Sequence, residues 1–323
     1  MTLSKLAKLA NVSVSVVSKA FSGRDDVSEA MREHVFAVAK EHGCFNQFYH
    51  VPYDKPVISV IIPEVISQYY IHCMQCLKSY IEESGYTMLL SISNFDSQMV
   101  GELVRYYTEH SKVDAIVCFG NIPCTDTTLD TVLISINKRS EKNQHVTNVA
   151  LNLSKGLGET IAFLKECGHK RIAYVGEPFT DGKLQTLKNS MLENGLVFDE
   201  KYAVCSHFRF EKAGKDGVEK LWSLENKPTA IIGAYGYITQ GILSELGQRG
   251  ILVPEDVSVV SLDNDPFPIS TEIDVSCIPS NIEGVCQAVI SLLNEKLSDR
   301  KTVLPKTVEI PTSFYVGNTV RSI

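Results

Sequence analysis

The sequence of 323 residues has no run of about 18 consecutive apolar residues, and no apolar segment precedes its first predicted helix. These absences argue against a membrane-spanning segment and against an export signal, so we expect a cytoplasmic protein. A disulfide framework is also unexpected. The nine cysteines are an odd number scattered through apolar segments, which is typical of reduced and buried thiols.

The usual signatures of enzymes and cofactor sites are missing as well. No phosphate-binding loop of the form G-x-x-x-x-G-K-[ST] or G-x-G-x-x-G follows a predicted strand. The eight histidines have no metal-ligand spacing, and the Cys73 and Cys76 pair lacks the second pair that a zinc site needs. His169 lies in a predicted helix-to-strand loop, where a turn-stabilising hydrogen bond is a commoner role than catalysis. We therefore expect no enzyme, no cofactor and no metal.

Positive charge is scarce over most of the chain. The formal net charge is -7 and the pI is near 5.7, which argues against non-specific binding of polyanions by the bulk of the molecule. Residues 1–50 differ, because they hold six lysines and arginines against five aspartates and glutamates. Any contact with nucleic acid is therefore expected in this N-terminal segment.

Residues 2–22 predict two short helices joined by a tight turn. The first helix has an apolar stripe of period near 3.6, and Thr2 stands at the position of its N-cap. Asn11 is one of the few residues other than glycine that tolerate a left-handed backbone, so it suits the turn. Ser13 then caps a second helix, in which Val17, Ala20 and Phe21 point inward.

The outward face of the second helix is the candidate DNA-reading surface. Such a helix would enter the major groove, with its N-terminus favouring phosphate. The alternative is an ordinary helical hairpin with a solvated outer face. The residues assigned to this surface are Ser13, Val14, Ser15, Ser18 and Lys19, together with Ser28 at the start of the third helix.

A third helix is predicted from Ser28 to about His42, and Gly43 ends it. It completes a three-helix core. The following segment, CFNQFYHVPYDKP, contains two prolines and has no helical periodicity after Val51, so residues 45–56 are interpreted as a linker. The predicted headpiece is thus residues 1–44.

From residue 57 onward, short apolar β runs alternate with amphipathic helices, the pattern of βαβ units that build parallel sheets. Two similar sets of four strands predict two doubly wound lobes with a ligand site at the carboxyl ends of the strands. The first set is 57–63, 87–93, 115–120 and 131–137, and the second is 171–177, 202–208, 230–236 and 257–263. We expect lobe 1 at about 57–152 and 280–305, and lobe 2 at about 153–279 and 306–323.

Three segments resemble one known family of transcriptional regulators. The run K-L-A-K-L-A-N-V-S-V-S-V-V-S-K, followed by a helix starting E-A-M-R-E-H-V, is similar to the DNA-binding headpiece of the lactose-repressor (LacI/GalR) family. C-G-H-K-R-I-A-Y-V-G-E and V-P-E-D-V-S-V-V-S-L-D-N resemble two core segments of the same family. The resemblance implies an α/β protein with a helix-turn-helix headpiece and a two-lobed core like that of periplasmic binding proteins.

The headpiece and linker depart from the family pattern at points that matter for DNA. Lys19 replaces a base-reading arginine, and a lysine lacks the rigid fork that reads guanine with two hydrogen bonds. Pro52 would truncate the hinge helix that the family forms on DNA, and a flexible tether without DNA contact is an open alternative. Gln47 and His50 are candidate phosphate contacts. An aromatic residue such as Phe48, Tyr49 or Tyr53 is a candidate wedge between bases.

By the same resemblance, the core binds a small metabolite between its lobes. The matching positions are Tyr69, Tyr70, Lys183, Arg209, Tyr235 and Asp263. Four of them have a simpler alternative, which is helix-start packing for Tyr69 and Tyr70, solvation for Lys183 and a surface ion pair for Arg209. Tyr235-Gly236 replaces a usual Asn-Asp pair, which removes a polar anchor for a sugar. The lost carboxylate, the two cations and several aromatic residues suggest an effector that is less hydroxylated than a sugar or is anionic, although a sugar-derived effector or a vestigial pocket is also open.

Two functions from different classes are consistent with these features. The first is a transcriptional repressor or other regulator that binds a pseudo-palindromic DNA operator as a homodimer and responds to a small metabolite. The second is a cytoplasmic protein that binds a sugar or sugar derivative, with a vestigial headpiece. A degenerate headpiece should have lost its inward apolar residues or its capping serines, and residues 1–43 retain both.

Overall fold

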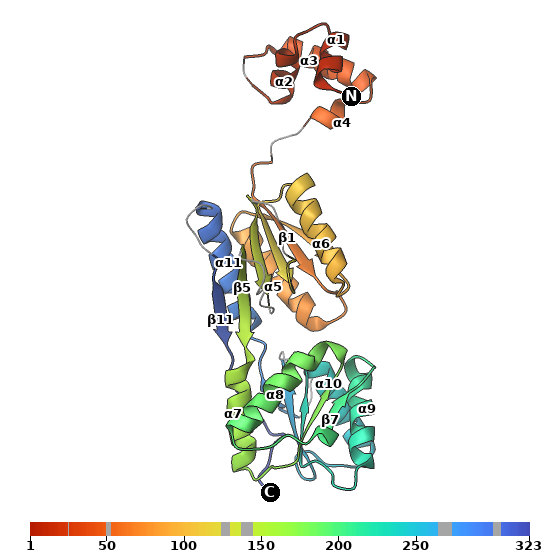
Figure 1. The fold of residues 1–323 in the computed structure, drawn as a ribbon, viewed down its shortest axis with the longest axis vertical. Coiled ribbons are helices and arrows are strands. Elements are labelled where there is room, and N and C mark those ends of the chain that lie inside the picture. The colour runs from red at the N-terminus through yellow and green to blue at the C-terminus, as the bar shows by residue number, and fades with distance from the viewer. Residues whose placement is uncertain (25, 50–52, 124–129, 137–144, 264–272, 300–304) are drawn as a thin grey trace. The chain divides into compact units, whose positions relative to one another are not determined.

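The computed structural model describes the whole chain except residues 25, 50–52, 124–129, 137–144, 264–272 and 300–304 (Figure 1). It divides into two compact units, Met1–Lys55 and Pro56–Ile323. No helix among the described residues is both long and apolar enough to cross a membrane.

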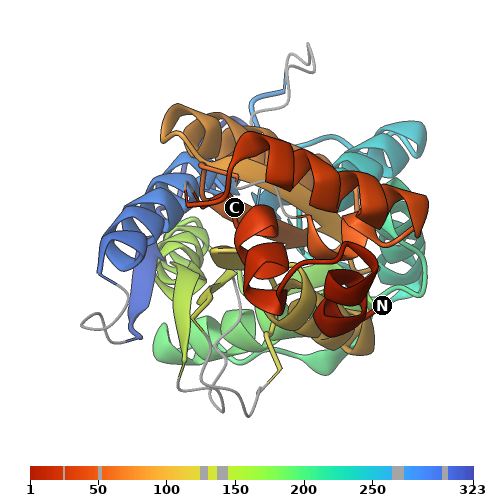
Figure 2. The ribbon, with the colours of Figure 1, turned by 90° about the horizontal axis from the view of Figure 1, so that it is seen from above.

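The N-terminal unit consists of helices gathered around one small core (Figure 2). Its helices are α1 (Leu3–Leu9), α2 (Val14–Phe21), α3 (Glu29–Glu41) and α4 (Phe45–Phe48). The three predicted N-caps are confirmed, because the side-chain oxygens of Thr2, Ser13 and Ser28 each accept a hydrogen bond from a backbone N–H three residues later. Asn11 has a φ of 55°, so the predicted left-handed turn is also confirmed.

The linker prediction is wrong at its start, because the chain forms α4 and packs it on the headpiece. Phe45 and Phe48 lie 5.9 and 5.7 Å from the Phe21 ring, and Phe36 meets Phe45 edge-on at 5.1 Å. Tyr49 stacks on Phe45 at 4.5 Å. Aromatic pairs at these separations bury large areas, so the headpiece extends to about residue 49.

The first lobe is built on a six-stranded parallel sheet in the order β11-β5-β4-β3-β1-β2. The strands are β1 (Val57–Ile62), β2 (Thr87–Ile92), β3 (Ala115–Phe119), β4 (Val132–Ile136), β5 (Val146–Asn152) and β11 (Thr307–Pro311). Alternate residues of β1 point to opposite faces. Ile58, Val60 and Ile62 join a core with α5 (Gln68–Glu83) and α11 (Ile282–Ser298), whereas Ile61 joins a core with α6 (Ser97–Arg105).

The second lobe is built on a five-stranded parallel sheet in the order β10-β9-β8-β6-β7. The strands are β6 (Ile172–Gly176), β7 (Ala203–Cys205), β8 (Ala230–Gly233), β9 (Ser258–Leu262) and β10 (Ser276–Ile278). The helices of this lobe are α7 (Leu153–Glu166), α8 (Asp181–Glu193), α9 (Phe210–Ser223) and α10 (Gly236–Gln248). All eight predicted strands therefore exist in the predicted sheets, although β7 is much shorter than predicted.

The lobe boundary predicted at the C-terminus is wrong for one strand. Residues 306–323 were expected in lobe 2, but β11 pairs in parallel with β5 of the first sheet. The chain then returns to the second lobe, where Tyr315 bridges to Cys277 and the backbone of Thr319 accepts a hydrogen bond from Val259. The chain thus passes between the lobes three times, after β5, after β10 and after β11 (Figure 1).

Close contact between α9 and α10 depends on two glycines. A Cβ atom added at Gly214 would lie 2.1 Å from the Ile238 carbonyl oxygen, and one added at Gly241 would lie 2.1 Å from the Glu211 carbonyl oxygen. Backbone atoms cannot move aside as a flexible side chain can. We expect Gly241→Ala to lower the free energy of unfolding by about 1–3 kcal/mol, as in other overpacked cores.

The matched control for this prediction is Gly158→Ala, because Gly158 lies in the middle of α7 with open space where a Cβ would stand. That change should raise the free energy of unfolding by roughly 0.5–1 kcal/mol through helix propensity alone. Urea unfolding of both variants measures the difference. Equal effects at Gly241 and Gly158 would show that the two helices are not in close contact.

Candidate functional site

The outer face of α2 presents the predicted DNA-reading residues to solvent. Ser13, Val14, Ser15 and Ser18 are exposed, and Val14 has 44% of its surface accessible although it is apolar. Ser13 also keeps its capping bond of 3.2 Å to the Val16 amide. An exposed polar face next to a capped helix N-terminus suits an approaching phosphate.

Lys19 is not a freely extended side chain on this face. Its ammonium group is 2.5 Å from the Asp26 carboxylate, in the loop between α2 and α3. The hydrogen bond from Lys19 lowers the pKa of Asp26. A carboxylate therefore competes with DNA for the lysine that was predicted to read a base.

The other DNA candidates differ in their surroundings. The Ser28 hydroxyl caps α3 by accepting a 3.4 Å hydrogen bond from the Met31 amide, so this side chain has a structural role apart from any DNA contact. The Gln47 amide donates to the Met1 carbonyl oxygen at 2.8 Å, which ties α4 to the N-terminus. His50 and Pro52 lie outside the described residues. Phe48 packs against the headpiece core. Tyr49 stacks on Phe45 but is 38% exposed, and Tyr53 is 63% exposed, so these two tyrosines remain candidate wedges.

The predicted effector residues of the core come together at the carboxyl ends of the parallel strands. Tyr235 follows β8, Asp263 follows β9 and Arg209 lies between β7 and α9. Two glutamates that sequence reasoning missed lie at equivalent places, since Glu64 follows β1 and Glu177 follows β6. The signal that could have found them is the position itself, directly after a buried strand.

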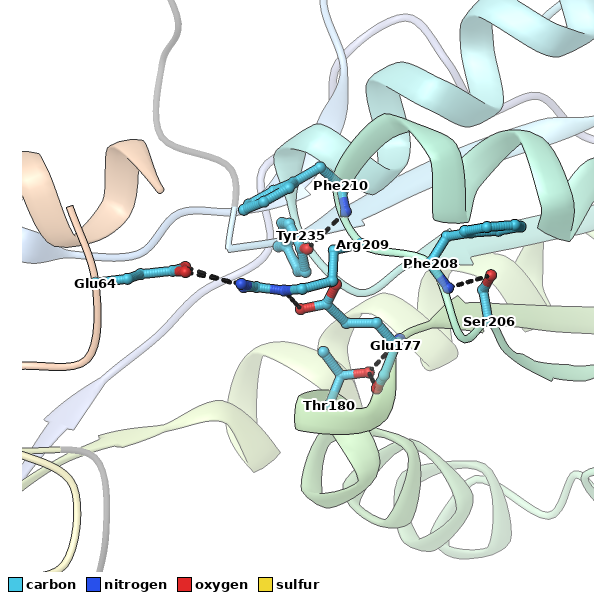
Figure 3. Close-up of polar contacts among 8 residues, drawn as sticks. All are labelled: Glu64, Glu177, Thr180, Ser206, Phe208, Arg209, Phe210 and Tyr235. Atoms are coloured by element: carbon cyan, nitrogen blue, oxygen red, sulfur yellow. Dashed lines mark hydrogen bonds and ion pairs between the residues drawn. The ribbon is translucent and has the colours of Figure 1, made fainter. Parts of the chain in front are cut away.

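Arg209 is the centre of this arrangement (Figure 3). Its Nη1 and Nη2 atoms donate to the two oxygens of Glu64 at 2.7 and 2.9 Å, and its Nε donates to Glu177 at 3.2 Å. The Glu64 and Glu177 side chains are only 8% and 2% exposed. The hydrogen bonds that Arg209 donates to Glu64 are the main cause of the raised pKa of Arg209, so the guanidinium stays charged.

Lys183 and Asp263 form a second ion pair in the same region. The Lys183 ammonium group contacts the Asp263 carboxylate and donates to the Ala234 carbonyl oxygen at 2.9 Å. Both side chains are about three-quarters buried. Asp263 has a φ of 48°, a strained conformation for a residue other than glycine, and such strain is concentrated at functional sites.

Aromatic side chains surround these two ion pairs. The Tyr235 hydroxyl accepts a hydrogen bond from the Phe210 amide at 3.3 Å, and burial is the main cause of its raised pKa. Tyr70 packs edge-on against Phe95 and Phe119, and burial raises its pKa as well. Tyr69 meets the Tyr70 ring at 5.2 Å. Both the functional and the packing roles predicted for the two tyrosines are compatible with this geometry.

The charges bear on the predicted effector. Arg209 and Lys183 were the basis for expecting an anionic ligand, but each already has a carboxylate partner. The three carboxylates of Glu64, Glu177 and Asp263 outnumber the two cations. Because the site carries no excess of positive charge, the reason for expecting an anion does not hold.

His169 has a structural role, as the sequence predicted. Its Nε2 donates to the Arg321 carbonyl oxygen at 3.0 Å, and its Nδ1 accepts from the Thr229 hydroxyl at 3.0 Å. These bonds tie the C-terminal residues to the second lobe. Among the described residues, no group of histidine, cysteine and acidic side chains could hold a metal ion.

Comparison with known proteins finds a family model that matches each of the two units. Residues 2–44 match the model of bacterial regulatory proteins of the lacI family, and residues 161–320 match that of a periplasmic binding protein-like domain. The HTH-type transcriptional repressor CytR of Escherichia coli K12 is 25% identical over 279 residues, which cover 81% of this chain and 80% of CytR. Catabolite control protein A of Priestia megaterium is 24% identical and covers 96% of both chains.

The solved structures show the same fold. The lac repressor dimer bound to operator and the anti-inducer ONPF superposes with a TM-score of 0.69 at 18% identity, over 99% of both chains. The likeness extends over headpiece and core alike.

The environment of His169 predicts a pH effect on stability. Burial lowers its pKa below the ordinary value of 6.5, so folding favours the neutral ring. Its stabilising contribution should be complete above about pH 6.5 and decline as the pH falls below that value. We expect the free energy of unfolding of the wild type to fall more steeply between pH 7.5 and pH 5 than that of His169→Gln. Parallel curves in urea unfolding at each pH would contradict this role.

Proposed function

We infer that this chain is a member of the LacI family of bacterial regulatory proteins and a sequence-specific DNA-binding regulator of transcription that acts as a repressor. The observation that carries this conclusion is the intact headpiece. All three N-caps are formed, the core is buried, and the face of α2 is exposed and polar. A vestigial headpiece is expected to lose its caps or its buried core, and this one retains both. The alternative of a binding protein without DNA recognition is therefore not supported.

We propose that two copies of the chain act together on DNA. One headpiece offers a single short reading helix, which makes too few base contacts for tight and specific binding. A homodimer presents two such helices to a pseudo-palindromic operator, and its symmetry matches that of the site. The likeness to a repressor dimer supports this proposal.

The effector is proposed to bind at the strand ends between the lobes. The support is the gathering of Tyr70, Lys183, Tyr235 and Asp263 at one edge of two parallel sheets. A ligand bound there can change operator affinity only as far as it prefers one arrangement of the lobes over another. Ligand binding would then alter operator affinity by changing the relative position of the two headpieces.

Lys19 is the sharpest test of the DNA surface. We expect Lys19→Ala to weaken specific operator binding by about 1–3 kcal/mol, the range for a base-directed contact, with little effect on non-specific DNA. The matched control is Lys201→Ala, which removes the same charge from an exposed position in the other unit. Gel-shift titrations at one salt concentration measure both. An unchanged specific affinity would remove Lys19 from the reading surface.

The ion pair of Lys19 predicts that Asp26 restrains DNA binding. We expect Asp26→Asn to tighten operator binding, because the lysine no longer has to leave a carboxylate partner. In the Lys19→Ala background, the same change should have a smaller effect. A double-mutant cycle in gel shifts separates the pairwise effect from the general loss of negative charge. Equal effects in both backgrounds would show that Asp26 acts only through net charge.

The effector site predicts that Asp263→Ala abolishes the change in operator affinity caused by a metabolite. The metabolite is first found by thermal-shift screening of sugars, sugar phosphates and nucleobases against the wild type. Asp199→Ala is the control, since Asp199 is an exposed partner of Lys201 outside this site. If Asp263→Ala still responds to the metabolite as the wild type does, the effector site lies elsewhere.

A further inference from the structure

The surroundings of Arg209 have the composition of a binding site for a cation. Two glutamates accept four hydrogen bonds from Arg209: Glu64 accepts one from each Nη atom, and both oxygens of Glu177 accept from Nε. Three phenylalanine rings lie around the guanidinium carbon, with centroids at 5.3 Å for Phe95, 5.2 Å for Phe179 and 4.5 Å for Phe210. Carboxylates and ring faces are the groups that recognise planar cations.

The two glutamates could not remain in place without a positive charge between them. Both are almost completely buried, and both approach the same guanidinium group (Figure 3). Two buried carboxylates around one point repel each other and lose their hydration. The position therefore requires a cation, whether it comes from the chain or from outside.

The same contacts connect the two lobes. Glu64 and Phe95 belong to the first lobe, whereas Glu177, Phe179 and Arg209 belong to the second. Phe95 and Phe179 stack on each other, with centroids 4.4 Å apart and planes inclined by 11°. The Glu64–Arg209 pair joins residues 145 positions apart in the sequence. Whatever occupies the space between the glutamates thus holds the lobes together.

We propose that Glu64 and Glu177, with the rings of Phe95 and Phe179, form a binding site for a planar cation, and that the side chain of Arg209 occupies this site and keeps the lobes closed without a small molecule. The ligand class that this site would accept is a guanidinium or amidinium compound. An anion is repelled by the two carboxylates. The regulatory meaning of this inference rests on the effector site proposed above, but occupancy and closure do not require the chain to bind DNA.

The first test removes the occupant. Arg209→Ala should open the lobes, so amide hydrogen exchange in residues 63–67, 93–96 and 177–180 should become at least tenfold faster than in the wild type. Arg209→Lys keeps the charge but cannot bind both oxygens of Glu64 through a planar fork, and it should exchange at an intermediate rate. Unchanged exchange in both variants would overturn the proposal. If Arg209→Ala does not fold, Glu64→Gln, which removes the first-lobe charge, is measured in the same way.

The second test refills the site with methylguanidinium. At about 10 mM, it should raise the melting temperature of Arg209→Ala and slow the exchange of the three segments, whereas sodium chloride at the same concentration should not. The wild type should not respond, because Arg209 already fills the site. Arg209→Ala combined with Glu64→Gln should lose the response. An equal response in that double variant, or none in Arg209→Ala, would refute a cation site.

These outcomes are independent of the proposed function. Gel shifts with the wild type test whether the chain binds an operator, and their failure would leave the exchange results unaffected. Conversely, if the wild type binds an operator but Arg209→Ala has the same amide hydrogen exchange rates as the wild type, the proposed function stands and the cation site is refuted.

Discussion

The parallel direction of every strand in both sheets is the constraint on which the rest of this structure depends. Parallel strands place all their carboxyl ends at one edge of a sheet, and the loops that follow them meet there. Glu64, Glu177, Tyr235 and Asp263 follow four different strands in two different sheets, yet they lie in one region. Residues far apart in the sequence become neighbours because of strand direction alone. The aromatic rings and ion pairs then define what that region can bind.

Much of the fold could be predicted because its signals are local. The N-caps, the Asn11 turn and the eight predicted strands are each specified by a few neighbouring residues, and these were found. Strand β5 was missed because Thr147 and Asn148 interrupt its apolar pattern, although both side chains are buried. Strand β11 was missed because it is an edge strand with an exposed glutamate, Glu309. Helix α4 has only four residues, which is too short to show any periodicity.

The functional region was only half predictable for a different reason. Family resemblance indicated Lys183, Arg209, Tyr235 and Asp263 one position at a time, but it said nothing of their partners in this chain. Whether an arginine attracts an anion depends on the carboxylates beside it, and Glu64 lies 145 residues away from Arg209. A single glutamate after a strand is too common to stand out. The charge of the region is therefore a property of the assembled lobes and not of any segment.

The threefold passage of the chain between the lobes has a consequence for synthesis on the ribosome. The first five strands of the first sheet are complete when residue 152 has been made, but α11 and β11 come from residues 282–311. Until then, the outer edge of β5 and the surface that α11 covers stay open in the nascent chain. Unpaired strand edges and uncovered apolar surface promote aggregation. Most of the second lobe is translated in this interval, so it has to fold while the first lobe is incomplete. The nascent chain is therefore most prone to aggregation during this interval.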